Sequence, residues 1–152
     1  MDAKGNRRIR ARKEVVLARL GDAATLAECI PKCKSLTGTM ADGFDFVISH
    51  KMGLFNATFR GRILFTELTP GTRYQLVVNG SGGLAGSVTV TATVEMEQMP
   101  KATLLAYTAQ CDLRGWKSML GGAKMETLFT EAIKRFFDRL TLRTEQGDAQ
   151  IG

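Results

Sequence analysis

Only a few side chains in this chain could carry out acid–base chemistry, and the clearest candidates are Glu67 and the single histidine, His50. One histidine leaves no metal site built on several histidines and no catalytic triad away from His50. Both candidates continue the inward-facing parity of predicted strands. A turn at Gly53 sets His50 opposite residues 55–57, however, so Glu67 should lie roughly 33 Å further along. We therefore expect no His50–Glu67 pair and interpret His50 as a strand-end histidine.

The three cysteines, Cys29, Cys33 and Cys111, are better interpreted as reduced thiols than as a metal site. Zinc would need Cys111 and His50, from distant strands, to complete the ligand set begun by Cys-Ile-Pro-Lys-Cys. The cysteine count is odd, and no export signal is recognisable at the N-terminus, which favours free thiols. The sequence therefore predicts no metal and no cofactor.

The glycine-rich stretch at residues 80–86, Gly-Ser-Gly-Gly-Leu-Ala-Gly, is the most unusual local segment. It does not suit a nucleotide phosphate, because a predicted strand rather than a helix N-terminus follows it. It suits a hairpin in which two backbones approach closely. The missing side chains would then leave space for a ligand or for a helix, and a simple flexible turn is the alternative.

Alternating apolar residues predict a run of antiparallel strands between Phe44 and Leu113, joined by short turns such as Met52-Gly53 and Pro70-Gly71. Every second side chain of a strand lies on one face, so the sheet should have one dry side and one wet side. The predicted inward-facing set is Phe44, Phe46, Ile48, Phe55, Ala57, Phe59, Ile63, Phe65, Tyr74, Leu76, Val78, Val88, Val90, Ala92, Val94, Met96, Leu105, Tyr107, Ala109, Cys111 and Leu113.

Apolar residues recur at three- and four-residue steps from Trp116 to Leu140, which predicts one long amphipathic helix. It should be roughly 36 Å long, close to the length of a strand of ten to twelve residues, and so can span the sheet. Short helices are expected near Lys13–Leu20 and Asp22–Ala27. A first strand is expected near Asn6–Ala11.

One domain is predicted over residues 1–143, with a basic arm at residues 1–8 and a polar tail at residues 144–152. A chain of 152 residues is long enough to bury about 68–70% of its unfolded surface. No apolar stretch reaches the length of a membrane span. The expected location is therefore the cytosol, including the inner face of a membrane.

Most of the net charge of +6 lies in residues 1–13, where six basic side chains face one acidic residue, Asp2. Such a segment could meet anionic lipid, an acidic partner protein or nucleic acid. Nucleic acid is the weakest of these, because no aromatic stacking platform lies beside the basic residues, and no nucleic-acid partner is predicted. A solvated terminus without any partner is the simpler alternative.

Several segments resemble one known family when they are taken in order. They include Ala11 to Asp22 with its Arg-Lys-Glu-Val-Val core, Leu26 to Cys33, Phe59-Arg60-Gly61 and Tyr74-Gln75-Leu76, and they extend to Phe136-Phe137. This pattern resembles the carbon monoxide dehydrogenase G-subunit (CoxG) family, a branch of the START-related polyketide cyclase and lipid-transfer superfamily. The resemblance covers about residues 11–140. Lys32 departs from it, because glycine commonly follows the Ile-Pro pair.

The resemblance implies an α+β helix-grip fold, with a long curved antiparallel sheet around one C-terminal helix and two short helices after the first strand. It also implies an accessory protein encoded with a molybdenum-containing dehydrogenase. Family members are thought to place that enzyme at the membrane or to carry an apolar molecule such as a quinone or lipid. Many continue past the last helix into a tail that attaches to the membrane.

Two functions follow, and a third interpretation needs no ligand. The first is a non-catalytic carrier or tether, and the second is a cyclase- or hydratase-like enzyme that uses Tyr74 or Tyr107 with His50 on a polyketide-like substrate. The predicted inner face is nearly free of ionisable groups, which favours the carrier. The third is a packed core. The candidate ligand-binding residues are Phe46, Phe55, Phe59, Tyr74, Val88, Val90, Tyr107, Met125, Phe129, Ile133 and Phe136.

Overall fold

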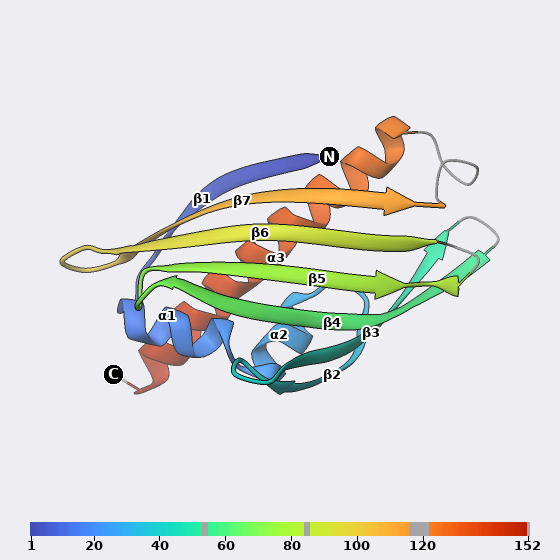
Figure 1. The fold of residues 1–152 in the computed structure, drawn as a ribbon. Helices are drawn as coiled ribbons and strands as arrows, with labels where there is room; N and C mark the ends of the chain where they lie inside the picture. Colours follow the sequence, from blue (N-terminus) through green and yellow to red (C-terminus); the bar gives the residue numbers. More distant parts are fainter. Residues whose placement is uncertain (53–54, 84–85, 116–121, 152) are drawn as a thin grey trace.

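The computed structural model describes residues 1–52, 55–83, 86–115 and 122–151 and contains an open antiparallel sheet of seven strands (Figure 1). The order across the sheet is β1-β7-β6-β5-β4-β3-β2, so every neighbouring pair except β1 and β7 is consecutive in the chain. The strands are β1 (Asp2–Ile9), β2 (Cys33–Thr39), β3 (Gly43–Met52), β4 (Phe55–Thr69), β5 (Arg73–Ser81), β6 (Ser87–Gln98) and β7 (Thr103–Arg114).

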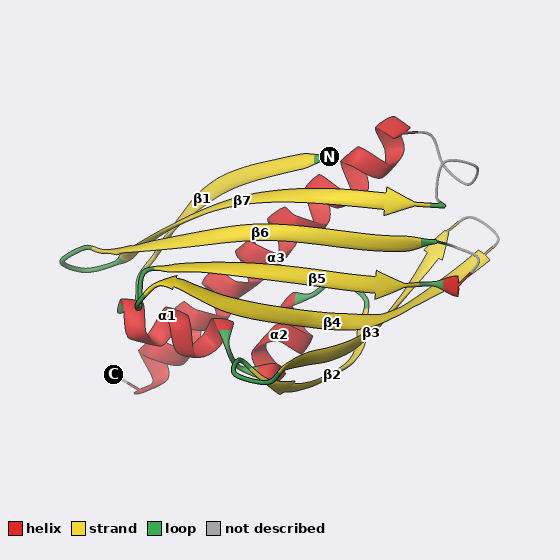
Figure 2. Cartoon of the chain, viewed as in Figure 1, coloured by secondary structure: helices red, strands yellow, loops and turns green. Residues whose placement is uncertain are grey.

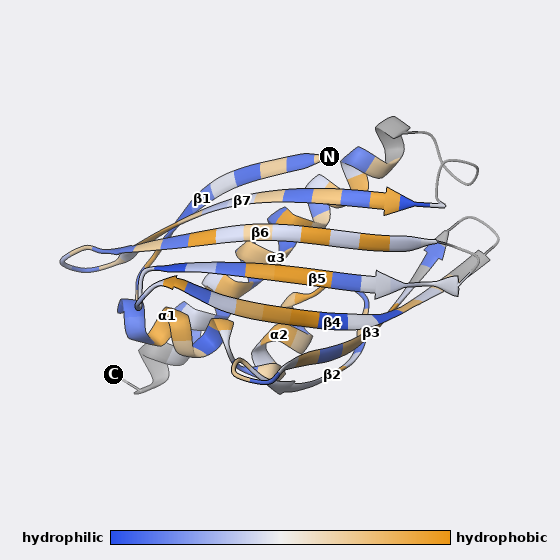
Figure 3. Cartoon of the chain, viewed as in Figure 1, coloured by the Kyte–Doolittle hydropathy of each residue, from blue (hydrophilic) through white to orange (hydrophobic). Residues whose placement is uncertain are grey.

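The strand register confirms the inward-facing set from the sequence. Phe46 lies opposite Gly61, Val78 opposite Val90, and Val94 opposite Tyr107, and directly paired residues share one face of the sheet. Along β7 the side chains alternate between buried and exposed for nine residues from Thr103 to Cys111. Figure 3 shows the same alternation of apolar and polar residues along β6 and β7.

Three helices complete the fold, α1 (Lys13–Leu20), α2 (Ala23–Cys29) and α3 (Gly122–Ile151). The Asp22 side chain caps α2, because its carboxylate accepts the Thr25 backbone N–H at 3.1 Å. Helix α3 crosses one face of the sheet and contacts α1, α2 and β1 (Figure 2). The predicted α+β architecture, with a sheet around a C-terminal helix and two short helices after the first strand, is confirmed.

Helix α3 extends well past the predicted end at Leu140, so most of the predicted polar tail, up to Ile151, is helical. Thr144 is fully buried there, and its hydroxyl donates to the Leu140 carbonyl at 2.6 Å. Glu145 accepts the backbone N–H of Arg10 at 2.9 Å. These contacts hold a segment whose polar composition suggested a tail. The predicted start of the helix, Trp116 to Gly121, lies outside the described residues.

Strand β1 begins four residues earlier than the predicted first strand and takes in the segment that the sequence assigned to a basic arm. It pairs with β7 along its whole length, from Asp2 opposite Gln110 to Ile9 opposite Thr103. Two of the basic residues in this region bind the last helix. The Arg7 guanidinium contacts Asp138 at 2.9 Å, and Arg10 contacts Glu145 at 3.3 Å. The N-terminal charge is thus partly neutralised within the fold.

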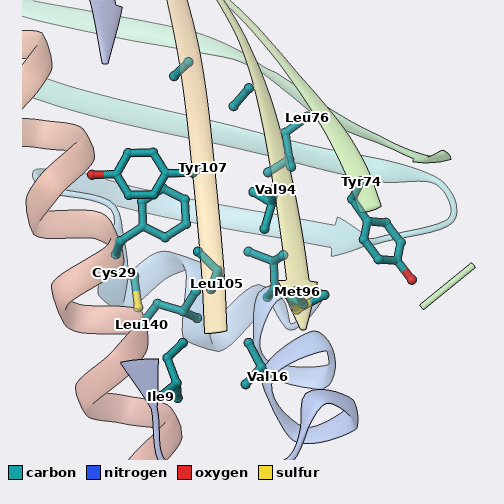
Figure 4. Packing of buried hydrophobic residues seen from close by; sticks show 14 of the residues in the cluster. Ile9, Val16, Cys29, Tyr74, Leu76, Val94, Met96, Leu105, Tyr107 and Leu140 are labelled. Carbon is teal, nitrogen blue, oxygen red and sulfur yellow. The ribbon is translucent and has the colours of Figure 1, made fainter. Parts of the chain in front are cut away.

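The main hydrophobic core lies between the sheet, α1 and the second half of α3. Val94 and Met96 of β6, Leu105 of β7 and Leu140 of α3 are almost completely buried in it. Figure 4 shows these side chains converging with Ile9 and Val16 beneath the helix. The aliphatic core therefore fixes one half of α3 against the sheet.

A strained turn joins α2 to β2. Lys32 has a φ of +63°, the only non-glycine residue with positive φ among those described. Its carbonyl accepts the Ser49 backbone N–H at 3.2 Å, which ties this turn to β3. A side chain in the left-handed region costs roughly 1–2 kcal/mol, and glycine avoids that cost.

Lys32→Gly is expected to raise the free energy of unfolding by about 0.5 kcal/mol, because relief of the backbone strain exceeds the entropy lost by a flexible residue. The midpoint of urea unfolding should rise at an unchanged m value. Lys34→Gly is the control, since it removes the same charge from a strand with ordinary φ and should lower stability. A fall in stability for Lys32→Gly would contradict the strain at this turn.

Candidate ligand site

The inner face of the sheet is packed unevenly along its length. On β6, Val94 is fully buried whereas Val88 and Val90, on the same face, are only half-buried. On β3, Phe44 is fully buried and Ile48 is half-buried. The half of the sheet near α1 is therefore closed, and the half at the other end is incompletely covered.

Helix α3 has the same gradient as the sheet beneath it. Phe137 and Leu140 are buried, whereas Met125, Phe129 and Ile133, on the same apolar stripe, are half-buried. The two incompletely covered surfaces face each other, since Phe129, Ile133 and Phe136 pack against the same core as Val90. We call this region the inner-face patch. It consists of Ile48, Val78, Val88 and Val90 on the sheet and Phe129, Ile133 and Phe136 on α3.

A separate small cluster lies beyond the inner-face patch. Ala57 and Phe59 of β4 are buried there, with Leu113 of β7 and Met125 of α3 packed against them. Two larger clusters hold the rest of the described buried core. A domain of this size usually has one contiguous core. The patch thus lies where the packing between sheet and helix is interrupted.

The glycine-rich segment forms the predicted hairpin between β5 and β6, closed by a hydrogen bond from the Gly82 N–H to the Gly86 carbonyl at 2.8 Å. Its strand glycines accommodate aromatic rings. A Cβ on Gly82 would lie 2.5 Å from the Phe59 ring, and one on Gly80 would lie 3.2 Å from the Phe46 ring. The space at these two glycines is therefore filled by the protein itself. Leu84 and Ala85 lie outside the described residues.

Tyr107, a predicted ligand residue, is part of the packed core. Its ring stacks on Phe137 with centroids 4.0 Å apart and planes at 6°, and the residue is buried. Its hydroxyl lies over Gly5 of β1, where a Cβ would come within 2.6 Å of it. The ring is therefore directed towards the β1 edge, away from Phe59 and Met125.

Tyr74 lies near α1, in the closed half of the sheet. Its hydroxyl donates to the Glu67 carboxylate at 2.7 Å and points away from the other labelled side chains in Figure 4. Burial raises the pKa of Tyr74, and the hydrogen bond to Glu67 raises this pKa further. The phenol therefore keeps its proton at neutral pH, and the pair lies at the opposite end from the small cluster.

The other predicted ligand residues divide among the clusters. Phe46 is buried in the core beside α2, Phe59 and Met125 meet in the small cluster, and Val88 and Val90 line the patch. The side chain of Phe55 lies outside the description. Ile48, Val78 and Leu113 were missing from the predicted site, although each has the inward parity of its strand and could have been included on that signal.

The register confirms the predicted separation of His50 and Glu67. His50 lies opposite Ala57, and Glu67 lies opposite Tyr74, ten residues further along β4, or roughly 33 Å. The side chain of His50 lies outside the description. An acid–base pair between these two residues is therefore ruled out by strand geometry.

The cysteines are not activated for chemistry. Burial raises the pKa of Cys29 and of Cys111 to about 11, and burial also raises the pKa of Cys33. Thiols of this kind stay protonated at neutral pH and are poor nucleophiles and metal ligands. Within the described part of the chain, no group of three or more potential ligands could hold a metal ion.

Comparison with known proteins gives one family and a common fold. A family model for CoxG, the G-subunit of carbon monoxide dehydrogenase, matches residues 5–144. A conserved protein from Geobacillus kaustophilus superposes with a TM-score of 0.83 at 23% identity, covering 96% of each chain. A START superfamily protein from Mycobacterium smegmatis gives 0.70 at 12% identity, covering 95% of this chain and 97% of that one.

A third solved structure, DynU16 from the dynemicin biosynthetic locus, gives a TM-score of 0.61 at 15% identity, and the match covers 97% of this chain and 48% of that one. At these identities the likeness concerns the fold alone, which is START-like. No curated protein matches this chain. Among the described residues, no helix is long and apolar enough to cross a membrane.

Proposed function

Because the chain belongs to the CoxG family of carbon monoxide dehydrogenase, we propose that it is a non-catalytic accessory protein of a molybdenum-containing dehydrogenase. In this role it binds an apolar molecule, such as a quinone or lipid, at the inner-face patch. No cofactor of its own is needed for this role. The family match supports the partner, and the packing of the patch supports the ligand.

One observation carries the ligand proposal, namely that apolar side chains face each other across the patch and are only half-buried. Val88 and Val90 on the sheet and Phe129 and Ile133 on α3 each keep part of their surface exposed to water. An apolar guest would cover these surfaces, and each Å² removed from water is worth about 25 cal/mol. Exposed apolar surface of this kind often marks a binding site.

The scarcity of ionisable groups supports a non-catalytic role. The charged inward-facing side chain of β1 is Arg7, and it is paired with Asp138 at 2.9 Å. Acid–base catalysis needs an ionisable group within reach of the substrate. The alternative cyclase-like enzyme would depend on Tyr74 or Tyr107, and both lie away from the small cluster around Phe59.

Recruitment of the dehydrogenase to the inner face of a membrane is the second part of the proposal. Lys4 and Arg8 support it, because they alternate with the inward residues of β1 and are exposed on the outer face of the sheet. Cations near an anionic bilayer are worth about 1 kcal/mol each. Co-sedimentation with anionic vesicles should fall as salt rises, and binding that is absent at low salt would refute this part.

Native mass spectrometry of gently purified protein tests the ligand directly. We expect a species heavier than the chain, which loses its extra mass after extraction with an organic solvent. The extract should contain a lipid or quinone. A chain that carries nothing, and that also fails to bind a neutral apolar dye such as N-phenyl-1-naphthylamine, would refute the carrier.

A further inference from the structure

Four basic side chains gather at one corner of the sheet, at the open end of the inner face. The strand register brings them together. Cys33 of β2 lies opposite Ile48 of β3, and Ile48 lies opposite Phe59 of β4. All four are exposed. They are Lys32 and Lys34 on either side of Cys33, Lys51 near the end of β3, and Arg60 next to Phe59, and we call them the basic corner.

The basic corner differs from the rest of the surface because its charges are not compensated. Elsewhere on the sheet, Arg62 pairs with Asp45 at 3.4 Å and Arg73 pairs with Glu95 at 3.2 Å. None of the four corner residues forms an ion pair with any residue that the structure describes. Like charges held together repel one another and attract an anion.

The corner adjoins the inner-face patch. Ile48, the patch residue on β3, is three residues from Lys51, which corresponds to roughly 10 Å along the strand. Ile48 also pairs with Cys33, between Lys32 and Lys34. The Lys32 carbonyl accepts the N–H of Ser49, the residue after Ile48. An apolar chain in contact with the patch can therefore end at these cations.

The opposite end of the sheet has no comparable excess. Arg10 pairs there with Glu145 at 3.3 Å, and Arg12 with Glu14 at 3.7 Å. The patch itself consists only of aliphatic and phenylalanine side chains, so a charged group in it would lose its hydration without a partner. A charge on the ligand can therefore be accommodated only outside the patch, and the corner is the nearby place where an anion is favoured.

We propose that the molecule held at the inner-face patch is an anionic amphiphile. Its apolar chain lies between the sheet and α3, and its carboxylate or phosphate group lies at the basic corner. This inference rests on the proposed function and narrows it from apolar molecules in general to those with an anionic head. Binding at the corner is an exposed charge–charge interaction, so it weakens as salt rises.

Displacement of N-phenyl-1-naphthylamine by three probes with the same twelve-carbon chain tests the proposal. Dodecanoate and dodecyl phosphate are expected to bind about fivefold more tightly than dodecanol at low salt, since several exposed ion pairs each contribute modestly. The preference should shrink towards equality at high salt. Comparison of the two anions distinguishes a carboxylate head from a phosphate head.

Variants separate the corner from the chain site. The double variant Lys51→Gln with Arg60→Gln should lose the preference for the anions while its affinity for dodecanol stays unchanged. The matched control is Arg8→Gln with Lys101→Gln, two exposed cations away from the corner, and it should keep the preference. Equal binding of all probes by the unmodified chain, or a preference that survives in the corner variant, would overturn the inference. Failure of the dye and of every probe to bind would instead overturn the proposed function.

Discussion

Leu140→Ala is expected to lower the free energy of unfolding by about 3 kcal/mol, whereas Met125→Ala on the same helix should lower it by only about 1 kcal/mol. Leu140 is completely buried in the main core, and its removal leaves a cavity between α3 and the sheet. Met125 is half-buried beside the small cluster around Phe59, so truncation there exposes little new surface. Alanine is a good helix former at both positions, so the difference reports packing.

Urea unfolding measures both effects, and the dye displacement assay provides a second readout. Met125→Ala should change the affinity for an apolar probe more than Leu140→Ala does, because Met125 lies next to the inner-face patch. Equal losses of stability in the two variants would mean that both halves of α3 are packed alike. That result would remove the structural basis of the ligand site.

The strands and the fold class could be predicted because they depend on periodicity. Phe44, Phe46 and Ile48 alternate with polar residues, and a half-buried antiparallel strand needs that pattern and little else. The turn at Gly53 fixes the register of β3 on β4, so the position of His50 opposite Ala57 could also be predicted. Local chemistry was sufficient for these features.

The two ends of the chain could not be predicted because long-range contacts stabilise them. Residues 144–151 look like a tail, yet Thr144 is buried and Glu145 accepts hydrogen bonds from Arg10, more than a hundred residues away. The basic N-terminal segment looks like an arm, yet Arg7 binds Asp138 and also lies 6.0 Å from the centre of the Tyr107 ring. Such partners are not visible in the local sequence.

The candidate site was only partly predictable for a related reason. Val90 and Val94 have the same side chain, the same strand and the same face, yet only Val94 is fully buried. The difference comes from the helix above them, which packs closely along its second half. Residue type and parity identify the inner face, but they do not distinguish a filled region from an open one.

Val90→Trp is expected to reduce the affinity for an apolar probe at least tenfold while changing stability by less than about 1 kcal/mol. The larger ring would occupy the inner-face patch, where side chains on both surfaces remain half-buried. In a closely packed interior the same substitution would force neighbouring residues apart at a cost of roughly 1–3 kcal/mol or more. Dye titration and urea unfolding of the same preparation measure the two quantities.

Val94→Trp is the matched control, four residues further along the same face of β6, where the valine is fully buried. It should destabilise the protein strongly, because the core against α1 and Leu105 has no room for an indole ring. A marked loss of stability in Val90→Trp as well would mean that the patch is filled by the protein's own side chains. The domain would then be a packed core, and its role beside the dehydrogenase would rest on surface contacts instead of a carried ligand.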